Sequence, residues 1–391
     1  MTLPGVVGKG LRALLGLVLL VVGWAGFFTL AAVYADYPVV PVSPPPGGAL
    51  GPRGAFHVHT TRSDGRGSEG EVAAAAKAAG LDFVVLTDHN DFAPREPAFI
   101  DGVLMVPGVE FSTAHGHLVG FGLKRPLEGV RRWMDGGEAE KAVRDAGGVS
   151  VLAHPVQTRN PWRHEEAARR ADGYELYSAD TFFRDATHRP FSRLLPALGA
   201  LLGNPVHGVM MLVEPGPEPM ARLLELEREK PRLALCAHDA HGLPRYEDVF
   251  RSMAMYLPPS ADGSSEALSG DAKEAAERVV RGLASGHAVC AFRALGEPAG
   301  FALEGLTPGA REAHVGDVLT VRLPPGSGKG VRIEVWGAGR LRPDGVSVEL
   351  MAEGAVQVEA WVLAPGGFFG ARWRPWIVPS PIQVLPRSGA R

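Results

Sequence analysis

The stretch Phe56-His57-Val58-His59-Thr60 decides the expected fold, because it places two histidines at the end of a short apolar run. The run from Ala55 to Val58 is expected to be a buried strand, on which residues two apart face the same side. Two imidazoles placed in this way can bind one metal ion. A single His-x-His is weak evidence, but similar polar motifs follow later apolar runs: Ser63-Asp64-Gly65, Thr87-Asp88-His89-Asn90, Val109-Glu110, His117, His154-Pro155 and Asp239-Ala240-His241.

The order of expected strands and helices favours an α/β fold. Ser68 and Glu71 have the spacing of a helix capping box and predict a helix from Val72 to Ala79. A strand from Leu81 to Leu86 then ends at the polar residues from Thr87 onward, and parallel α/β barrels present their chemistry at such strand ends. Two further helices are expected at 138–146 and 271–284, and strands at 103–106, 117–121, 148–152, 173–177, 233–237 and 287–292, the last of which would close a barrel.

Over residues 54–295 this ordered set of motifs resembles the PHP superfamily, named for polymerase and histidinol phosphatase domains. Within it, the chain looks like the branch with carbaryl-hydrolase-like and nucleotide phosphoesterase members. The resemblance implies a distorted (β/α)7 TIM-like barrel that carries a metallohydrolase site. It also implies a first ion held by His57, His59, Glu110 and Asp239, a second held by Glu110, His117 and His154, and a third held by Asp64, His89 and His241.

Nine candidate ligands are too many for one ion, so we expect two or three divalent ions per chain. Imidazole and carboxylate ligands suit manganese, zinc or iron. A water shared by two of these ions would lose its proton near neutral pH and attack the substrate, with Glu110 and Asp239 as the central carboxylates. Asp88 is a third candidate catalytic residue that would orient His89 or move a proton. The alternative is that Asp88 only caps its turn.

Cationic residues at the mouth of the site are the candidates for binding a phosphate group. Arg159 and Arg163 follow His154, and Arg184 follows the strand at 173–177. The alternative for all three is that they are solvated surface charges. Two other histidines are expected to lie near the site without binding metal: His115 at the rim and His238 in the lining of the pocket.

The N-terminal region predicts a membrane helix. Residues 13–35 carry no charge and are long enough to cross a bilayer, while Lys9 and Arg12 place residues 1–12 in the cytoplasm. A signal peptide cut after Ala35 is the alternative, and the protein would then be secreted. Either interpretation places the catalytic part outside the cytoplasm. Residues 36–53 contain six prolines and are expected to be an extended spacer that holds the domain off the membrane.

The two cysteines, Cys236 and Cys290, both lie in apolar runs. We interpret them as buried thiols, although export would permit a disulfide between them. Residues 296–391 show period-two alternation, for example at Val331, Ile333 and Val335, and predict an antiparallel β-sandwich accessory domain.

The leading functional hypothesis is a membrane-anchored, metal-dependent phosphoesterase that acts on small phosphomonoesters or nucleotide-type phosphoesters. The alternatives are a hydrolase of carbamates or carboxylic esters with the same site, a 5′–3′ exonuclease, and a non-catalytic binding protein. A net charge of −3 shows no basic excess, so nucleic acid is possible as a partner but not favoured. The sequence gives no indication of the oligomeric state.

Overall fold

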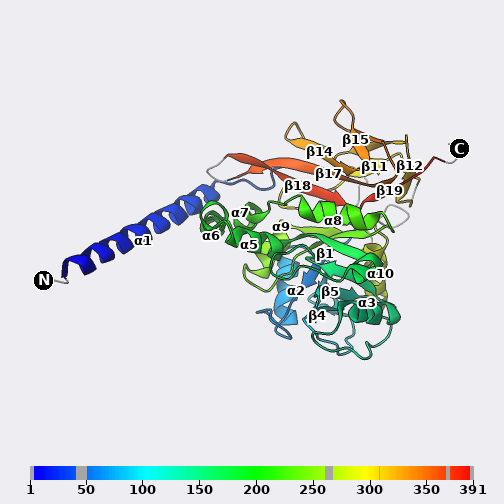
Figure 1. Ribbon diagram of the computed structural model, residues 1–391, viewed down its shortest axis with the longest axis horizontal. Helices are drawn as coiled ribbons and strands as arrows, with labels where there is room; N and C mark the ends of the chain where they lie inside the picture. The colour runs from blue at the N-terminus through cyan, green and yellow to red at the C-terminus, as the bar shows by residue number, and fades with distance from the viewer. Residues whose placement is uncertain (1–3, 41–50, 260–266, 308, 367–369, 388–391) are drawn as a thin grey trace.

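The computed structural model describes residues 4–40, 51–259, 267–307, 309–366 and 370–387. One long helix, α1 (Pro4–Val33), projects from a mixed α/β body (Figure 1). Its segment Lys9–Val33 is apolar, little buried and long enough to cross a membrane. These properties fit a membrane anchor and also a signal sequence.

Seven strands form the part of the body that carries the histidine motifs. Strands β1, β2 and β4 are parallel, β5 is antiparallel to both of its neighbours, and β6, β7 and β8 are again parallel. The segment after β8 returns to β1, where the His238 backbone N–H donates to the Phe56 carbonyl at 2.9 Å. The bounds are β1 (Arg53–Val58), β2 (Phe83–Leu86), β3 (Ala98–Ile100, paired with β4), β4 (Val103–Thr113), β5 (Gly116–Phe121), β6 (Val149–Ala153), β7 (Gly173–Ser178) and β8 (Leu233–Ala237).

The three helices expected among these strands are confirmed, with ends that shift by at most three residues. Helix α2 (Glu69–Ala78) begins with the predicted capping box, in which the Glu71 carboxylate accepts from the Ser68 backbone N–H at 2.7 Å. Helix α10 (Ala272–Ala284) is capped by Asp271, whose side chain accepts from two backbone N–H groups of the first turn. The remaining helices around these strands are α3 (Gly136–Asp145), α4 (Glu165–Arg170) and α9 (Tyr246–Ser252).

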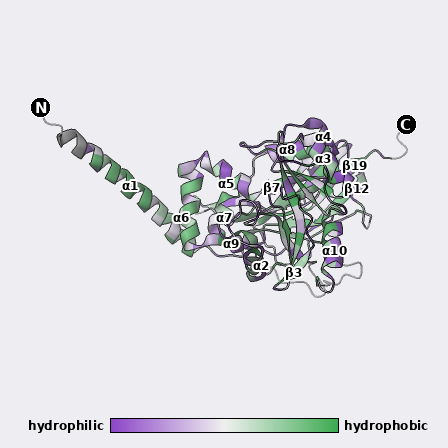
Figure 2. Cartoon of the chain, turned by 90° about the horizontal axis from the view of Figure 1, so that it is seen from below, coloured by the Kyte–Doolittle hydropathy of each residue, from purple (hydrophilic) through white to green (hydrophobic). Residues whose placement is uncertain are grey.

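A helical insertion between β7 and β8 was not anticipated from the sequence. It lies at the base of α1 (Figures 1 and 2). Its helix α6 (Leu195–Gly203) packs along α1 so closely that a Cβ atom on Gly203 would stand 2.1 Å from the Thr29 carbonyl oxygen. The helical insertion consists of α5 (Ala179–Thr187), the π-helical turn η1 (Pro190–Leu194), α6 (Leu195–Gly203), α7 (Pro205–Leu212) and α8 (Glu218–Glu227).

The expectation that residues 36–53 hold the domain off the membrane is wrong for both described ends of that segment. Val40 is buried, and its backbone N–H donates to the Leu295 carbonyl at 2.7 Å. Pro52 accepts from the Leu257 backbone N–H, and Arg53 already belongs to β1. The apolar side chain of Val40 gains more from burial than from an extended, solvated path. Residues 41–50, with most of the prolines, lie outside the described residues.

The strand predicted at 287–292 does not close a barrel. Strand β10 (Val289–Ala291) pairs antiparallel with β9 (Ala254–Tyr256) on one edge and with β18 (Ala371–Pro379) on the other. With both edges occupied, β10 has no free edge for β8, and it instead joins the strands of the site to those of the C-terminal part.

The C-terminal part consists of antiparallel strands, as the alternation predicts, but it continues the main sheet across the expected boundary at 295/296. The C-terminal part contributes five strands to the main sheet: β12 (Glu312–His314), β14 (Val331–Gly337), β17 (Gly354–Pro365), β18 and β19 (Ile382–Leu385). Of these, β12 and β19 are parallel to each other. A second sheet contains β11 (Ala302–Glu304), β13 (Val318–Arg322), β16 (Ser347–Leu350) and β15 (Gly339–Leu341).

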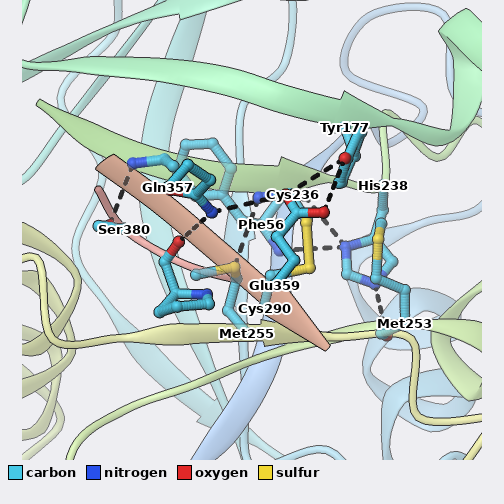
Figure 3. Close-up of a disulfide and its surroundings, with 12 residues drawn as sticks. Phe56, Tyr177, Cys236, His238, Met253, Met255, Cys290, Gln357, Glu359 and Ser380 are labelled. Carbon is cyan, nitrogen blue, oxygen red and sulfur yellow. Dashed lines mark hydrogen bonds between the residues drawn. A yellow bond between two sulfur atoms is a disulfide. The ribbon is translucent and has the colours of Figure 1, made fainter. Parts of the chain in front are cut away.

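The interpretation of Cys236 and Cys290 as free thiols is wrong. They form a disulfide between β8 and β10, with the Cα atoms 5.8 Å apart (Figure 3). The sequence separation of 54 residues hides this proximity, which results from the packing of β9 and β10 against the strands of the site. Disulfides of this kind persist in oxidising compartments.

A buried carboxyl group joins the C-terminal sheet to the strands of the site. Glu359 of β17 accepts hydrogen bonds from the Tyr177 hydroxyl of β7 at 3.1 and 3.2 Å (Figure 3). It also accepts from the Trp361 indole N–H at 2.8 Å. Burial raises the pKa of Glu359 to about 8, although these hydrogen bonds work in the opposite direction. The folded protein therefore holds a proton at Glu359 at pH values where the unfolded chain has lost it.

This raised pKa predicts a specific dependence of stability on pH. Between about pH 4.5 and 8, Glu359 holds a proton in the folded state that it has lost in the unfolded state. Its contribution to the free energy of unfolding should therefore fall as the pH rises, by up to about 1.4 kcal/mol per pH unit. Glu359→Gln should remove this contribution. Urea unfolding at pH 5, 6.5 and 8 measures it, with the exposed Glu353→Gln as the control. An unchanged pH slope in Glu359→Gln would contradict the assignment.

Candidate metal centre

His57 in β1 and His59, one residue after the end of β1, meet because the strand is irregular at that point. The register with β2 shifts between Ala55 and Val58, and His57 has a φ of 65°. The Nε2 atoms of His57 and His59 lie 3.1 Å apart. Their convergence was predicted from regular strand alternation, but the structure achieves it with a local bulge.

Four buried side chains bring one ligand atom each to a common point. Glu110 Oε2 lies 3.0 Å from His57 Nε2 and 3.1 Å from His59 Nε2, and Asp239 Oδ1 lies 3.3 and 3.2 Å from the same two atoms. An ion held at about 2.0 Å by a tetrahedron of ligands has ligand atoms roughly 3.3 Å apart. The spacing therefore fits one ion at the place predicted for the first, and the four residues form one of three groups that can hold a metal ion.

The second carboxylate oxygen of Glu110 serves a different group of ligands. Glu110 Oε1 lies 2.8 Å from His117 Nδ1 and 3.2 Å from His154 Nε2. His89 Nδ1 also approaches Glu110, at 3.1 Å from Oε2, and the tightest second group is His89, Glu110 and His117. The structure thus brings His154 to Glu110 as predicted. His89, which was predicted as a ligand of the third ion, also belongs to the group of Glu110 and His117.

The third group contains His59, Asp64, His89 and His241. Asp64 is the common partner, at 3.3 Å from His241 Nε2 and 3.7 Å from His89 Nε2 and His59 Nδ1. The side chain of Asp64 is 57% exposed, whereas the other two groups centre on fully buried Glu110. The third group is therefore the one most open to solvent.

Backbone strain gathers at three of the candidate ligands. His57, His154 and Asp239 have φ values of 65°, 31° and 44°, in the left-handed region that side chains with a Cβ atom rarely adopt. Each such residue costs on the order of 1–3 kcal/mol, and such strain is characteristic of functional sites. The backbone is thus strained at three candidate ligands, two of which, His57 and His154, contact the carboxylates of Glu110 and Asp239.

The electrostatics of the site favour positive charge beside two buried carboxylates. Glu110 and Asp239 are buried, and their ion pairs among the described residues are all with histidines. Burial by itself would raise the pKa of Glu110, but His57, His89 and His117 bring that pKa well below its ordinary value. Conversely, Glu175, Glu110 and Asp239 overcome burial and raise the pKa of His57 well above its ordinary value. Protonated imidazoles can supply this charge, and so can divalent ions.

Glu175 is a functional residue that the sequence reasoning missed. Its carboxylate accepts from His57 Nδ1 at 2.6 Å and from the His154 backbone N–H at 2.7 Å. The first bond fixes the tautomer of His57, so that Nε2 is free to bind an ion. The available signal was a charged residue in the fully buried strand β7.

Glu175→Ala is expected to weaken metal binding by about 10- to 100-fold, because the imidazole of His57 loses the partner that orients it. Titration of the metal-free protein with Mn²⁺ or Zn²⁺ against a chelator of known affinity measures the effect. Asp172→Ala is a matched control, because Asp172 precedes the same strand and binds Ser150 and Lys230 instead. Equal metal affinity in wild type and Glu175→Ala would contradict this role.

Asp88 does not face the metal ligands. Its two carboxylate oxygens accept from the Thr60 backbone N–H at 2.7 Å, the Thr60 hydroxyl at 2.9 Å and the Ser63 hydroxyl at 2.8 Å. Buried and fully bonded, it holds the turn that follows β1. The turn-capping alternative therefore describes Asp88 better than the predicted catalytic role, because no bond to His89 or to an open cavity remains.

The three candidate arginines occupy different places. Arg159 and Arg163 are exposed, and neither lines the cavity beside the ligands. Arg184 does line that cavity and forms an ion pair with Asp180. The structure thus brings only Arg184, of the three, to the ligands.

The two histidines expected near the site without binding metal have other hydrogen-bond partners, and His238 lines the cavity beside the ligands as predicted. His115 pairs with Asp135 at 3.4 Å and accepts from the Gly136 backbone N–H. His238 is buried and its Nε2 donates to the Met253 carbonyl at 2.8 Å. Neither side chain belongs to the three groups of candidate ligands.

Comparison with known proteins gives only distant structural similarities. No protein-family model and no curated protein sequence matches the chain. One similar solved structure is a two-domain protein from Bacteroides vulgatus with a predicted PHP-like metal-dependent phosphoesterase, with a TM-score of 0.39 and 15% identity over 86% of this chain and 98% of that one. A protein from Bifidobacterium adolescentis, assigned as a metal-dependent phosphoesterase, has a TM-score of 0.33 and 17% identity over 51% and 90%.

A third similar structure is the lesion-specific endonuclease EndoQ from Pyrococcus furiosus, with a TM-score of 0.35 and 13% identity over 53% of this chain and 52% of that one. All three TM-scores and identities are too low for a conclusion about family or activity. The function must therefore be argued from the site itself.

Proposed function

We propose that this chain is a PHP-type metal-dependent hydrolase whose substrates are phosphoesters. The observation that carries the proposal is the position of Glu110, whose two oxygens face two different sets of imidazoles. A carboxylate in this position can join two ions. The order of the ligands along the chain and the strand ends that carry them support the PHP-type barrel and the di- or trinuclear site that the sequence resemblance implies.

The residues of the chain have distinct parts in this proposal. Bound divalent ions would supply Lewis-acid chemistry and a water of lowered pKa. His57, His59, Glu110 and Asp239 would hold the central ion, while Glu175 orients His57 and Asp88 fixes the turn that positions His59. Arg184, at the wall of the cavity, would face the phosphate oxygens.

We also propose that α1 is retained as a membrane anchor, with the catalytic part outside the cytoplasm. Phe28 and Ala32 are buried, and the Thr29 hydroxyl donates to the Gly199 carbonyl at 2.7 Å. Cleavage after Ala35 would remove these contacts and expose α6. The Cys236–Cys290 disulfide supports an oxidising compartment. The intact mass of the membrane-extracted protein tests this proposal, because cleavage would remove residues 1–35.

A substrate screen tests the proposed reaction. The full-length protein, purified in detergent and loaded with Mn²⁺ or Zn²⁺, should release phosphate from p-nitrophenyl phosphate and other phosphomonoesters, and chelation should abolish this activity. If the loaded protein is inert on phosphoesters but cleaves carbamates or carboxylic esters, the site serves a different hydrolysis. If only single-stranded DNA is degraded, the chain is a nuclease.

A further inference from the structure

The helical insertion contains a second apolar segment that the N-terminal helix does not account for. Residues 194–213 include no Asp, Glu, Lys or Arg, and they form α6 and α7 with Asn204 between them. Each helix is too short to cross a bilayer. Charge-free segments that fold back in this way are typical of re-entrant or interfacial elements.

Helix α6 is fixed beside the membrane helix and leaves an apolar face free. Gly199 and Gly203 let its backbone approach α1, since a Cβ atom on either glycine would stand within 2.5 Å of an α1 carbonyl oxygen. On the adjoining face of α6, about 100° round the helix from these glycines, Leu202 is 80% and Leu198 41% exposed, and nearby Phe191 is 64% exposed. Figure 2 shows α6 and the adjoining part of α1 with the same hydrophobic colouring. If α1 spans the membrane, this face of α6 lies at the membrane surface.

Helix α7 connects this membrane-facing element to the candidate metal centre. Val209, Leu212 and Val213 line a cavity of about 210 Å³ together with Phe182 and Phe183 of α5. The polar end of the same cavity is formed by Asp64, Asp239 and His241, all candidate ligands. Leu243, also in the lining, is 70% exposed.

The charges in this cavity discriminate between kinds of substrate. Among its described lining residues the only Lys or Arg is Arg184, which is already paired with Asp180. Asp64, Asp180 and Asp239 make the lining acidic in the absence of ions. A nucleotide with several phosphates would find no further cation, whereas a hydrocarbon group would find apolar walls. The volume of this cavity is below the roughly 300–1,000 Å³ of most small-molecule sites, so only the first part of a long hydrocarbon group would fit.

We propose that the substrate is a membrane-borne amphiphile, a phosphomonoester of a long-chain alcohol, which reaches the metal centre from the bilayer past α6 and α7. This proposal rests on the phosphoesterase function proposed above. Water attacks phosphorus, the bond from phosphorus to the alkoxy oxygen breaks, and a proton from the water goes to the departing alcohol, which leaves inorganic phosphate. The hydrocarbon near the phosphate lies against Phe182, Val209 and Leu212, and the remainder stays in the bilayer.

The test compares dodecyl phosphate with ethyl phosphate as substrates of the full-length, Mn²⁺-loaded protein in phosphatidylcholine nanodiscs. Each buried methylene group contributes roughly fourfold to binding, so kcat/KM for dodecyl phosphate should exceed that for ethyl phosphate by at least about tenfold. Leu202→Asp should lower the rate on dodecyl phosphate and leave that on ethyl phosphate unchanged. Leu243→Asp should bring the ratio of the two kcat/KM values toward one.

Leu363→Asp is the control, because Leu363 is an exposed leucine (40%) on β17, outside the helical insertion. It should leave both rates unchanged. Hydrolysis of ethyl phosphate without any preference for the dodecyl ester, or a preference for nucleoside monophosphates, would overturn the amphiphile proposal while the phosphoesterase function stands. Failure to hydrolyse either alkyl phosphate or p-nitrophenyl phosphate would overturn both.

Discussion

Glu110→Ala is expected to abolish hydrolysis, with a loss of kcat/KM of more than about 1,000-fold, and to reduce the number of bound metal ions. Of the residues that the structure describes, Glu110 is the one whose side chain lies within 3.2 Å of five imidazoles, those of His57, His59, His89, His117 and His154. Its removal takes a ligand from two of the three groups at once. The measurements are metal analysis of the purified protein and phosphate release from p-nitrophenyl phosphate.

A second substitution separates charge from shape at the same position. Glu110→Gln keeps the volume of the side chain but replaces one anionic oxygen with an amide nitrogen, which cannot bind a cation. We expect it to lose activity nearly as completely as the alanine variant. The exposed Glu138→Ala serves as the control and should retain full activity and metal content. Full activity in either Glu110 variant would show that the chemistry does not depend on a carboxylate between two ions.

The candidate ligands were predictable because each belongs to a local pattern. A polar residue directly after an apolar run signals a strand end, and a capping residue signals a helix start. These signals placed Asp239, His154 and the capping box of α2 correctly. Local patterns depend on neighbouring residues, so the sequence displays them directly.

The features that sequence reasoning missed depend on residues far apart in the chain. Glu175 acts on His57, 118 positions away, and nothing near Glu175 reveals that partner. The charge-free sequence of residues 194–213 indicates an apolar element. Its position beside α1, however, results from close contact of Gly199 and Gly203 with Ala25 and Thr29. The expectation that β10 closes a barrel failed for the same reason. Both edges of β10 pair with distant strands, β9 and β18, and the sequence of β10 itself does not show this pairing.

The metal-free site is expected to release protons when it binds ions, so metal affinity should fall steeply at low pH. Hydrogen bonds that the His59 imidazole donates to the Asp239 and Glu110 carboxylates overcome the effect of burial and raise its pKa to about 9, and the pKa of His57 is also raised. Both imidazoles are therefore protonated in the metal-free protein at neutral pH, and an ion must displace those protons. His89 does not contribute, because burial lowers its pKa to about 4.

The sign and size of the effect follow from these pKa values. Below about pH 9 each displaced proton weakens the apparent affinity tenfold per pH unit, so two protons give up to about 100-fold per unit. Calorimetric titration at pH 7 in buffers of different ionisation enthalpy should show release of more than one proton per first ion. In the metal-free protein, His59 should also contribute stability that is present below about pH 6.5 and is lost as the pH rises through 9.

His115→Gln is the control for this experiment, because His115 lies at the rim with Asp135 and should not change the number of protons released. His59→Gln should reduce that number by about one and weaken binding of the first ion. An affinity that stays constant between pH 6 and 8 would mean that the imidazoles are already neutral before the ion arrives. The charges of Glu110 and Asp239 would then be balanced by other histidines such as His154, or these carboxyl groups would themselves hold protons, because an unpaired buried charge is costly.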